Sequence, residues 1–126
     1  GLSPAPTLER VKKLEQAGII ASYHAKLDIK AMGLQVKTFV LVSLNWKNQD
    51  TMDRFLEKIR LIDEVTEVYI ITGEAEALIK IICKDIPTYE HILFKKLSQI
   101  EEIERLKSMV TLSTAKDSMV LPLKYD

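Results

Sequence analysis

The chain has 126 residues, 47% hydrophobic and 29% charged, and its 18 basic and 18 acidic side chains give a formal net charge of zero. This composition predicts one packed domain with a short appendage, and no apolar run of ~18 residues predicts a membrane span. A single cysteine, Cys83, excludes an internal disulfide and is typical of a reducing compartment, so we expect a cytoplasmic protein.

Positive charge is enriched at the start of the chain. Residues 1–26 carry four basic and two acidic side chains, whereas residues 27–126 carry fourteen basic and sixteen acidic ones. This asymmetry is small, but it places the positive end of the molecule at the beginning of the chain.

The first segment has the signals of one amphipathic helix. Ser3 can cap it, Pro4 suits its first position, and Gly18 can end it in the left-handed conformation, so we predict a helix over about residues 4–17. Apolar and polar side chains recur on separate sides at helical spacing. The apolar stripe is Leu8, Val11 and Leu14, and the polar stripe is Thr7, Arg10 and Lys13. A helix-turn-helix recognition helix requires these two sides, although a charged stripe is more often only a solvated face.

The rest of the chain shows an alternating pattern after an extended segment at 19–27 and a helical turn at 28–32. We predict strands at 38–45, 65–72, 77–83 and 103–112 and helices at 50–60, capped by Asp50, and at 87–98. Inward-facing helix residues are expected to be Met52, Phe55, Leu56, Ile59, Ile92, Leu93 and Leu97. The order β-α-β-β-α-β predicts an α+β, ferredoxin-like sheet domain, with a short edge strand at 120–123 as a further element.

Both faces of the predicted sheet are apolar. In the first strand Phe39 and Leu41 alternate with Val40 and Val42, and the third strand alternates in the same way. Both helices of such a fold cover one face, so the second face would be left in water at a large cost in free energy. We therefore expect this face to pack on another copy of the chain.

One longer motif spans the predicted helix and its end: Ser3-Pro4-x-x-x-Leu8-Glu9-Arg10-Val11-x-x-Leu14-Glu15-x-x-Gly18-x-Ile20. Further pieces follow at Tyr23, Leu27-Asp28, Thr72-Gly73-Glu74 and Asp85-x-x-x-Tyr89. Together they resemble the leucine-responsive regulatory protein/AsnC family, the feast/famine transcription regulators. The resemblance implies double-stranded DNA and a free amino acid as partners, and a homodimer, made through the sheet, that assembles into an octamer.

The resemblance also implies a division of the chain. Residues 1–35 would be the remnant of a winged helix-turn-helix DNA-binding domain with its linker strand, and residues 36–126 the effector-binding and oligomerisation domain. Family members have further helices before the recognition helix, so we expect this chain alone to form an incomplete DNA-binding domain. The residues expected to contact DNA are Ser3, Pro4, Thr7, Arg10 and Lys13.

The turn between the second and third predicted strands is the candidate effector site. In its simplest interpretation it is a hairpin in which glycine permits a positive φ. The resemblance places it at a contact between dimers, where N–H groups near Gly73 would hold a carboxylate and an acidic side chain an ammonium group. The implied site residues are Thr72, Gly73, Glu74, Ala75 and Glu76, opposite Thr111 and Ser113.

The sequence contains few residues that could form a catalytic, metal-binding or phosphate-binding site. His24 and His91 lack ligand-spaced neighbours, Cys83 is expected to be a buried small hydrophobe, and Trp46 is as consistent with edge packing as with function. No convergent acid–base set, metal site or glycine-rich phosphate loop stands out, so we expect no cofactor and no enzyme activity. The leading hypothesis is an amino-acid-responsive transcription regulator. The alternatives are a sheet-only sensor or assembly module without DNA binding, and an enzyme or metal-binding protein on a ferredoxin-like scaffold.

Overall fold

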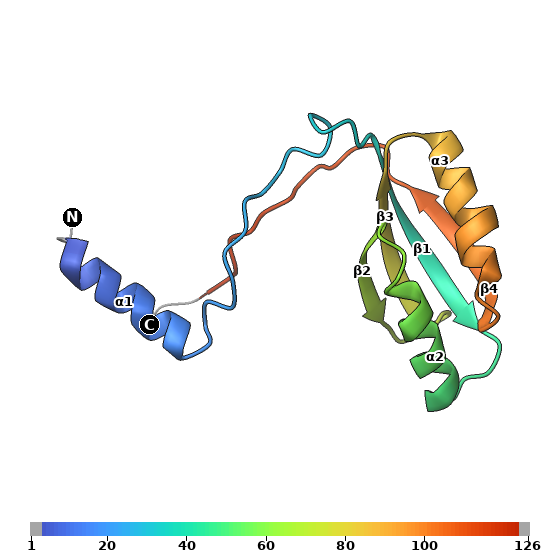
Figure 1. Cartoon of the computed structure of the whole chain (residues 1–126), viewed down its shortest axis with the longest axis horizontal. Helices are drawn as coiled ribbons and strands as arrows, with labels where there is room; N and C mark the ends of the chain where they lie inside the picture. Colours follow the sequence, from blue (N-terminus) through green and yellow to red (C-terminus); the bar gives the residue numbers. More distant parts are fainter. Residues whose placement is uncertain (1–3, 124–126) are drawn as a thin grey trace.

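The computed structural model describes residues 4–123. It confirms the predicted β-α-β-β-α-β order behind a separate first helix (Figure 1). Three helices and four strands form the framework: α1 (Pro4–Gln16), β1 (Val36–Leu44), α2 (Gln49–Ile59), β2 (Val65–Ile70), β3 (Ala77–Cys83), α3 (Ile86–His91) and β4 (Ile103–Val110). The strands form one sheet of order β2-β3-β1-β4, in which each neighbouring pair is antiparallel.

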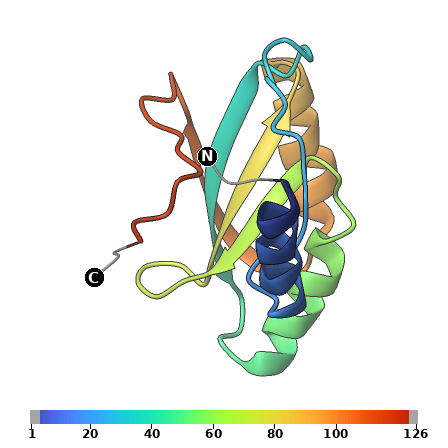
Figure 2. The same ribbon diagram turned by 90° about the vertical axis from the view of Figure 1, so that its left-hand side faces the viewer.

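Two layers make up the sheet domain. Figure 2 shows α2 and α3 on one side of the sheet, whereas the β2–β3 turn and the C-terminal segment project toward the other side. The core between sheet and helices contains the predicted inward residues, with Phe55, Ile59, Ile92 and Leu97 fully buried and Met52, Leu56 and Leu93 packed against them. Cys83 is also buried there, as predicted, and burial raises the pKa of its thiol.

The second face of the sheet has no covering element within residues 4–123. β1 alternates between fully buried side chains such as Val40 and half-buried ones such as Phe39 and Leu41. β3 alternates in the same register, since Phe39 pairs with Lys80 and Leu41 pairs with Leu78. We call this surface the open face. Its members on the two central strands are Lys37, Phe39, Leu41, Leu78, Lys80 and Ile82.

Side-chain caps set the starts of α2 and α3. α2 begins one residue earlier than predicted, and its N-cap is Asn48, whose side chain accepts a 2.9 Å hydrogen bond from Thr51 N–H. The prediction of Asp50 as the cap is therefore wrong: Asp50 lies in the first helical turn, where its charge still suits the helix dipole. Asp85 caps α3 in the same way through Thr88 N–H at 2.8 Å, and these hydrogen bonds lower the pKa of its carboxyl.

The second sheet-covering helix is not regular over its predicted length. After α3 the chain continues as a π-helical segment, Ile92–Lys96, and a 3₁₀ turn, Leu97–Gln99. Ile92 and Leu97 are five residues apart, and a regular α-helix would place them on different faces. The wider π turn, in which Leu97 N–H donates to the Ile92 carbonyl, brings both side chains into the core.

The C-terminal segment leaves the sheet after β4. The predicted edge strand at 120–123 is wrong, because these residues form no ladder with the sheet. Instead, residues 111–123 form an extended arm. Its start is held by Thr111, whose N–H and Oγ1 both donate to the Lys37 carbonyl, at 2.9 and 2.8 Å.

α1 lies away from the sheet at the end of an extended linker (Figure 1). It ends as predicted at Gly18, which has φ of +75°, and the N–H of Ile19 donates to the Leu14 carbonyl as in a Schellman motif. In the linker, Asp28 Oδ1 accepts hydrogen bonds from the N–H groups of Lys30 and Ala31 and so closes the predicted turn. None of the helices in residues 4–123 is long and apolar enough to cross a membrane.

Candidate functional site

The first of the two predicted sites, the DNA-contacting surface, lies on α1. The side chains of Thr7, Arg10 and Lys13 are exposed along one side of this helix. Pro4 begins the helix as predicted, while Ser3 lies outside the described residues. The apolar stripe is also uncovered within residues 4–123, with Leu8 60% and Leu14 39% exposed. α1 therefore presents a basic face and, separately, an apolar face that packs on nothing in this part of the chain.

The second surface is the β2–β3 turn. Ile71 N–H donates to the Glu76 carbonyl at 3.1 Å, so Thr72 to Ala75 form the loop that this bond closes. Gly73 has φ of +117°, and a Cβ added there would meet nothing within 4 Å. Glycine is therefore required for the backbone conformation, not for space.

Glu76 has a structural role that the sequence did not reveal. Its Oε2 accepts a 2.9 Å hydrogen bond from Leu44 N–H at the end of β1, and its Oε1 lies 3.4 Å from Lys47 Nζ. Its side chain is only 17% exposed. The carboxylate thus continues the β1–β3 ladder beyond its last main-chain bond, Glu76 N–H to the Val42 carbonyl. Its predicted use as an acceptor for a ligand ammonium competes with these contacts.

Next to the turn lies a cavity of about 390 Å³, which we call the turn cavity. Glu74 and Ala75 enter it from the turn, and two cations, Arg105 and Lys107, enter from β4. The remaining lining residues are Leu41, Ser43 and Leu106. One carboxylate, two cations and a hydroxyl group around a small space can hold a molecule that carries both signs of charge.

Thr111 and Ser113 lie elsewhere in the same chain. Thr111 is bonded to Lys37 at the start of β1, whereas the turn adjoins Leu44 at its end, roughly 23 Å away at the rise of a β-strand. The two residues line a different and larger cavity of about 700 Å³. A site containing both the turn and the end of β4 would therefore need two subunits.

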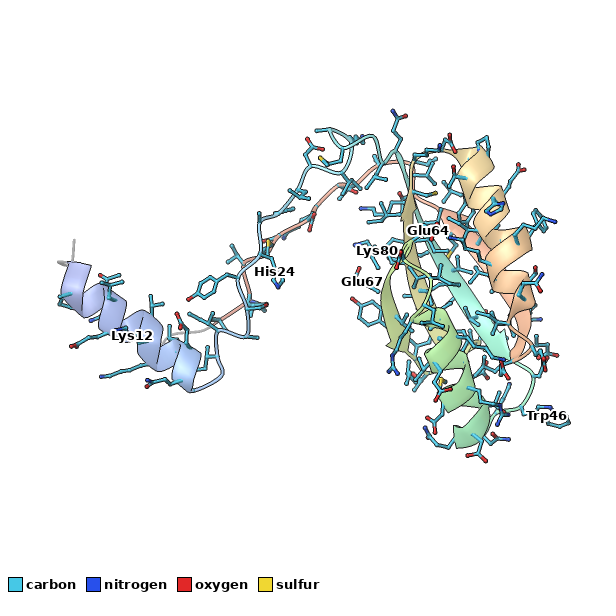
Figure 3. All side chains as sticks on the ribbon, in the orientation of Figure 1. Lys12, His24, Trp46, Glu64, Glu67 and Lys80 are labelled. Carbon is cyan, nitrogen blue, oxygen red and sulfur yellow. The ribbon has the colours of Figure 1, made fainter. Side chains whose placement is uncertain are left out.

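The remaining candidates are scattered. His24 lies on the linker (Figure 3) and His91 on α3, and both side chains are exposed. Trp46 is 70% exposed and points away from the sheet domain, so it is not an edge-packing residue. Within residues 4–123 no three histidine, cysteine or acidic side chains are grouped as metal ligands.

The sequence prediction missed Ser43, Arg105 and Lys107. A signal was available, because alternate residues of a strand share one face and Arg105 and Lys107 are both polar members of such a set. What the sequence could not show was the pairing of β4 with β1, in which Arg105 lies opposite Ser43 and Lys107 opposite Leu41. That register brings these side chains beside the turn.

Several residues of the family motif make contacts that explain why those residue types are needed at their positions. Tyr23 Oη donates a 2.7 Å hydrogen bond to Glu15, which joins the linker to α1. Asp85 caps α3, and one turn later Tyr89 is buried with its hydroxyl 2.7 Å from Ser108 Oγ on β4. The Asp85-x-x-x-Tyr89 spacing thus fixes the helix start and its attachment to the sheet.

The chain is similar in sequence to known transcriptional regulators. Residues 37–121 match the Lrp/AsnC ligand binding domain. The chain is 33% identical to the transcriptional regulator AzlB of Bacillus subtilis, over 98% of this chain and 78% of that protein. It is 34% identical to the regulatory protein AsnC of Escherichia coli, over 89% of this chain and 72% of that protein.

Solved structures agree with this fold. A transcriptional regulator from Neisseria meningitidis, solved as a complex with L-Met, superposes with a TM-score of 0.89 at 30% identity, over 96% of this chain and 78% of that one. Escherichia coli AsnC superposes with a TM-score of 0.84 at 31% identity, over 95% of this chain and 79% of that one. These relatives are transcriptional regulators, not enzymes. The chain therefore belongs to the Lrp/AsnC family of transcriptional regulators.

Proposed function

We propose that this protein is a DNA-binding transcription regulator that responds to a small free amino acid. The observation that carries the proposal is the turn cavity, which combines Glu74 with Arg105 and Lys107 around about 390 Å³. A free amino acid is a zwitterion and needs an anion and a cation from its site. The complex of the Neisseria meningitidis relative with L-Met supports this class of ligand.

The contacts of Glu76 refine which residues would bind. Because Glu76 is occupied by Leu44 N–H and Lys47, the exposed Glu74 is the better acceptor for an ammonium group. The ligand carboxylate would bind Arg105 or Lys107, with N–H groups near Gly73 as further donors. Glu76 then acts as a positioning residue that holds the turn against the end of β1.

Assembly through the open face supplies the second part of the proposal. This face carries half-buried apolar side chains on both central strands, and pairing two copies would remove them from water. Leu41 belongs to both the open face and the turn cavity. Ligand binding would therefore be coupled to contacts between subunits, and the resulting dimers would assemble further, toward an octamer.

The effector site is tested by Glu74→Gln. Removing the charged acceptor is expected to weaken amino-acid binding by about ten- to a hundredfold, the equivalent of about 1.5–3 kcal/mol. Isothermal titration calorimetry, after a thermal-shift screen of the twenty amino acids, measures this change. Glu57→Gln, at an exposed position of α2, is the matched control and should bind like the wild type. Equal binding by both variants would place the site elsewhere, and binding of none of the twenty by the wild type would reject an amino-acid effector.

The DNA-binding part is tested by Arg10→Ala. Arg10 lies in the middle of the exposed basic side of α1, so its loss in the intact protein should weaken operator binding. A base contact would reduce discrimination by roughly 1–3 kcal/mol, whereas a phosphate contact would weaken all sequences alike and lower the salt slope by about one. Fluorescence anisotropy at two salt concentrations separates these cases. Unchanged binding to every sequence would remove Arg10 from the interface and favour the sheet-only assembly module.

A further inference from the structure

One end of the sheet domain carries two exposed large apolar side chains. At this end β1 and β2 finish and β3 and β4 begin. Trp46, in the β1–α2 loop, is 70% exposed, and Ile70, the last residue of β2, is 64% exposed. We call this surface the turn end, and it consists of residues 45–48 of that loop, Ile70, and residues 72–75 of the β2–β3 turn.

The rest of the molecule leaves the turn end free. The linker and the C-terminal arm leave the sheet at the opposite end, so α1 also lies on that side (Figure 1). The β1–α2 loop passes below the ends of the strands, from the sheet to the helical layer (Figure 2). A second copy packed on the open face would therefore leave this loop and its indole in water.

The loop that carries Trp46 is held on both sides, although the indole itself is mostly exposed. Before it, the Asn45 N–H donates to the Glu102 carbonyl at 2.9 Å, and the Asn45 side chain donates to the Glu101 carbonyl. After it, Asn48 caps α2. An aromatic side chain on a fixed loop loses little conformational entropy when a partner buries it, so this loop is suited to a contact.

The turn end also carries both signs of charge in exposed positions. The Lys47 side chain, next to Trp46, is 72% exposed, and Glu74 is exposed in the turn. The pairing of Lys47 with Glu76, at 3.4 Å, leaves most of the lysine in water. A surface with an apolar anchor, a cation and an anion suits a second copy of itself, because in a two-fold contact each cation can face a carboxylate of the other copy.

We propose that the turn end is the contact surface between two dimers, with Trp46 as its anchor. This inference rests on the proposed function, in which dimers formed through the open face assemble further. Aromatic side chains such as tryptophan carry a large share of the binding energy of an interface. One such contact is too small to hold two monomers together, and it becomes stable only where each dimer presents two turn ends.

The chain contains a single tryptophan, so its fluorescence reports directly on this contact. When the wild-type protein is concentrated from dimers into the larger assembly, the emission maximum should shift to shorter wavelength and quenching by acrylamide should fall, because the indole leaves water. Light scattering on the same samples, without added amino acid, measures the mass. An indole that stays as exposed in the larger assembly as in the dimer would overturn the role of Trp46.

Trp46→Gln tests the contact by its effect on mass. The concentration at which half of the dimers associate should rise at least about tenfold, while circular dichroism and the dimer itself stay as in the wild type. Leu61→Gln is the matched control, because Leu61 is 83% exposed after the far end of α2 and should leave the assembly unchanged. Equal association of wild type and Trp46→Gln, or an equal loss with Leu61→Gln, would overturn the turn-end contact.

The masses also separate this contact from the proposed function. A wild type that remains a dimer at every concentration would overturn the turn-end contact alone, since the open-face dimer would stand. A monomeric wild type would overturn both. A Trp46→Gln variant that falls to a folded monomer would place Trp46 in the contact within the dimer, and so would also overturn the proposal.

Discussion

Phe39→Asp is expected to dissociate the assembled protein into a 14.4 kDa monomer. Phe39 is half-buried on β1 in the middle of the open face, between Lys80 of β3 and Met109 of β4. Burying one large apolar side chain contributes roughly 1.5–3 kcal/mol. Because a two-fold interface uses each residue twice, the loss is about 3–6 kcal/mol, a weakening of roughly a hundred- to ten-thousandfold.

Size-exclusion chromatography with light scattering measures this mass at micromolar concentration. Phe94→Asp is the matched control, because Phe94 is exposed on the helical side of the molecule and should leave the assembly unchanged. Far-ultraviolet circular dichroism shows whether the variant remains folded, as expected for a residue outside the core. A folded Phe39→Asp protein with the wild-type mass would exclude the open face as the interface, and so would a monomeric wild type.

Glu102→Gln is expected to lower the free energy of unfolding by about 1.5–3 kcal/mol at pH 7. Glu102 is 8% exposed just before β4, and its carboxylate joins that strand to α2 through Lys58 at 2.6 Å and Arg54 at 3.3 Å. These are charge-assisted hydrogen bonds to a carboxylate that is almost buried, so they are stronger than a pair between two exposed groups. Glutamine keeps the shape but loses the charge.

The destabilisation caused by Glu102→Gln should become smaller as the pH falls. The hydrogen bond from Lys58, more than any other cause, lowers the pKa of Glu102 in the folded protein below its unfolded value. The stabilisation is therefore fully present above the unfolded pKa and is lost as the pH falls through the folded pKa. Wild type and Glu102→Gln should differ most at pH 7 and converge under acid conditions.

Urea denaturation measures the difference in free energy of unfolding between the wild type and Glu102→Gln. The protein concentration is kept fixed, because assembly makes the unfolding midpoint depend on concentration. The neighbouring Glu101 is exposed, and Glu101→Gln serves as the control with little change at any pH. If the difference in free energy of unfolding between wild type and Glu102→Gln stays constant from pH 7 into the acid range, the charge of Glu102 is not the cause of that difference.

Much of the local structure follows from the sequence alone. The period of apolar residues gave the element order, the two-sided sheet and the inward faces of both covering helices, because burial must follow the geometry of each element. The stop of α1 at Gly18 and the turn at Gly73 were readable because only glycine adopts those φ values easily. The family motif was visible for a similar reason, since capping and buried hydroxyl contacts demand particular residue types.

Other features depend on parts of the chain that meet only after folding. Asn48 rather than Asp50 caps α2, and the π turn forms so that Ile92 and Leu97 both reach the core. Glu76 is committed to Leu44 by the pairing of β3 with β1. No local pattern encodes these choices, because competing positions along the sequence are chemically equivalent until packing selects one of them.

The binding surfaces show the same division. The sequence by itself determined which residue types are present at the β2–β3 turn, and that the sheet has a second apolar face. Only the tertiary structure decided that Arg105 and Lys107 join Glu74, and that Thr111 and Ser113 lie at the other end of the sheet, beside the cavity of about 700 Å³. The physical reason is strand register, since a shift of β4 by one residue against β1 would turn Arg105 and Lys107 to the opposite face of the sheet.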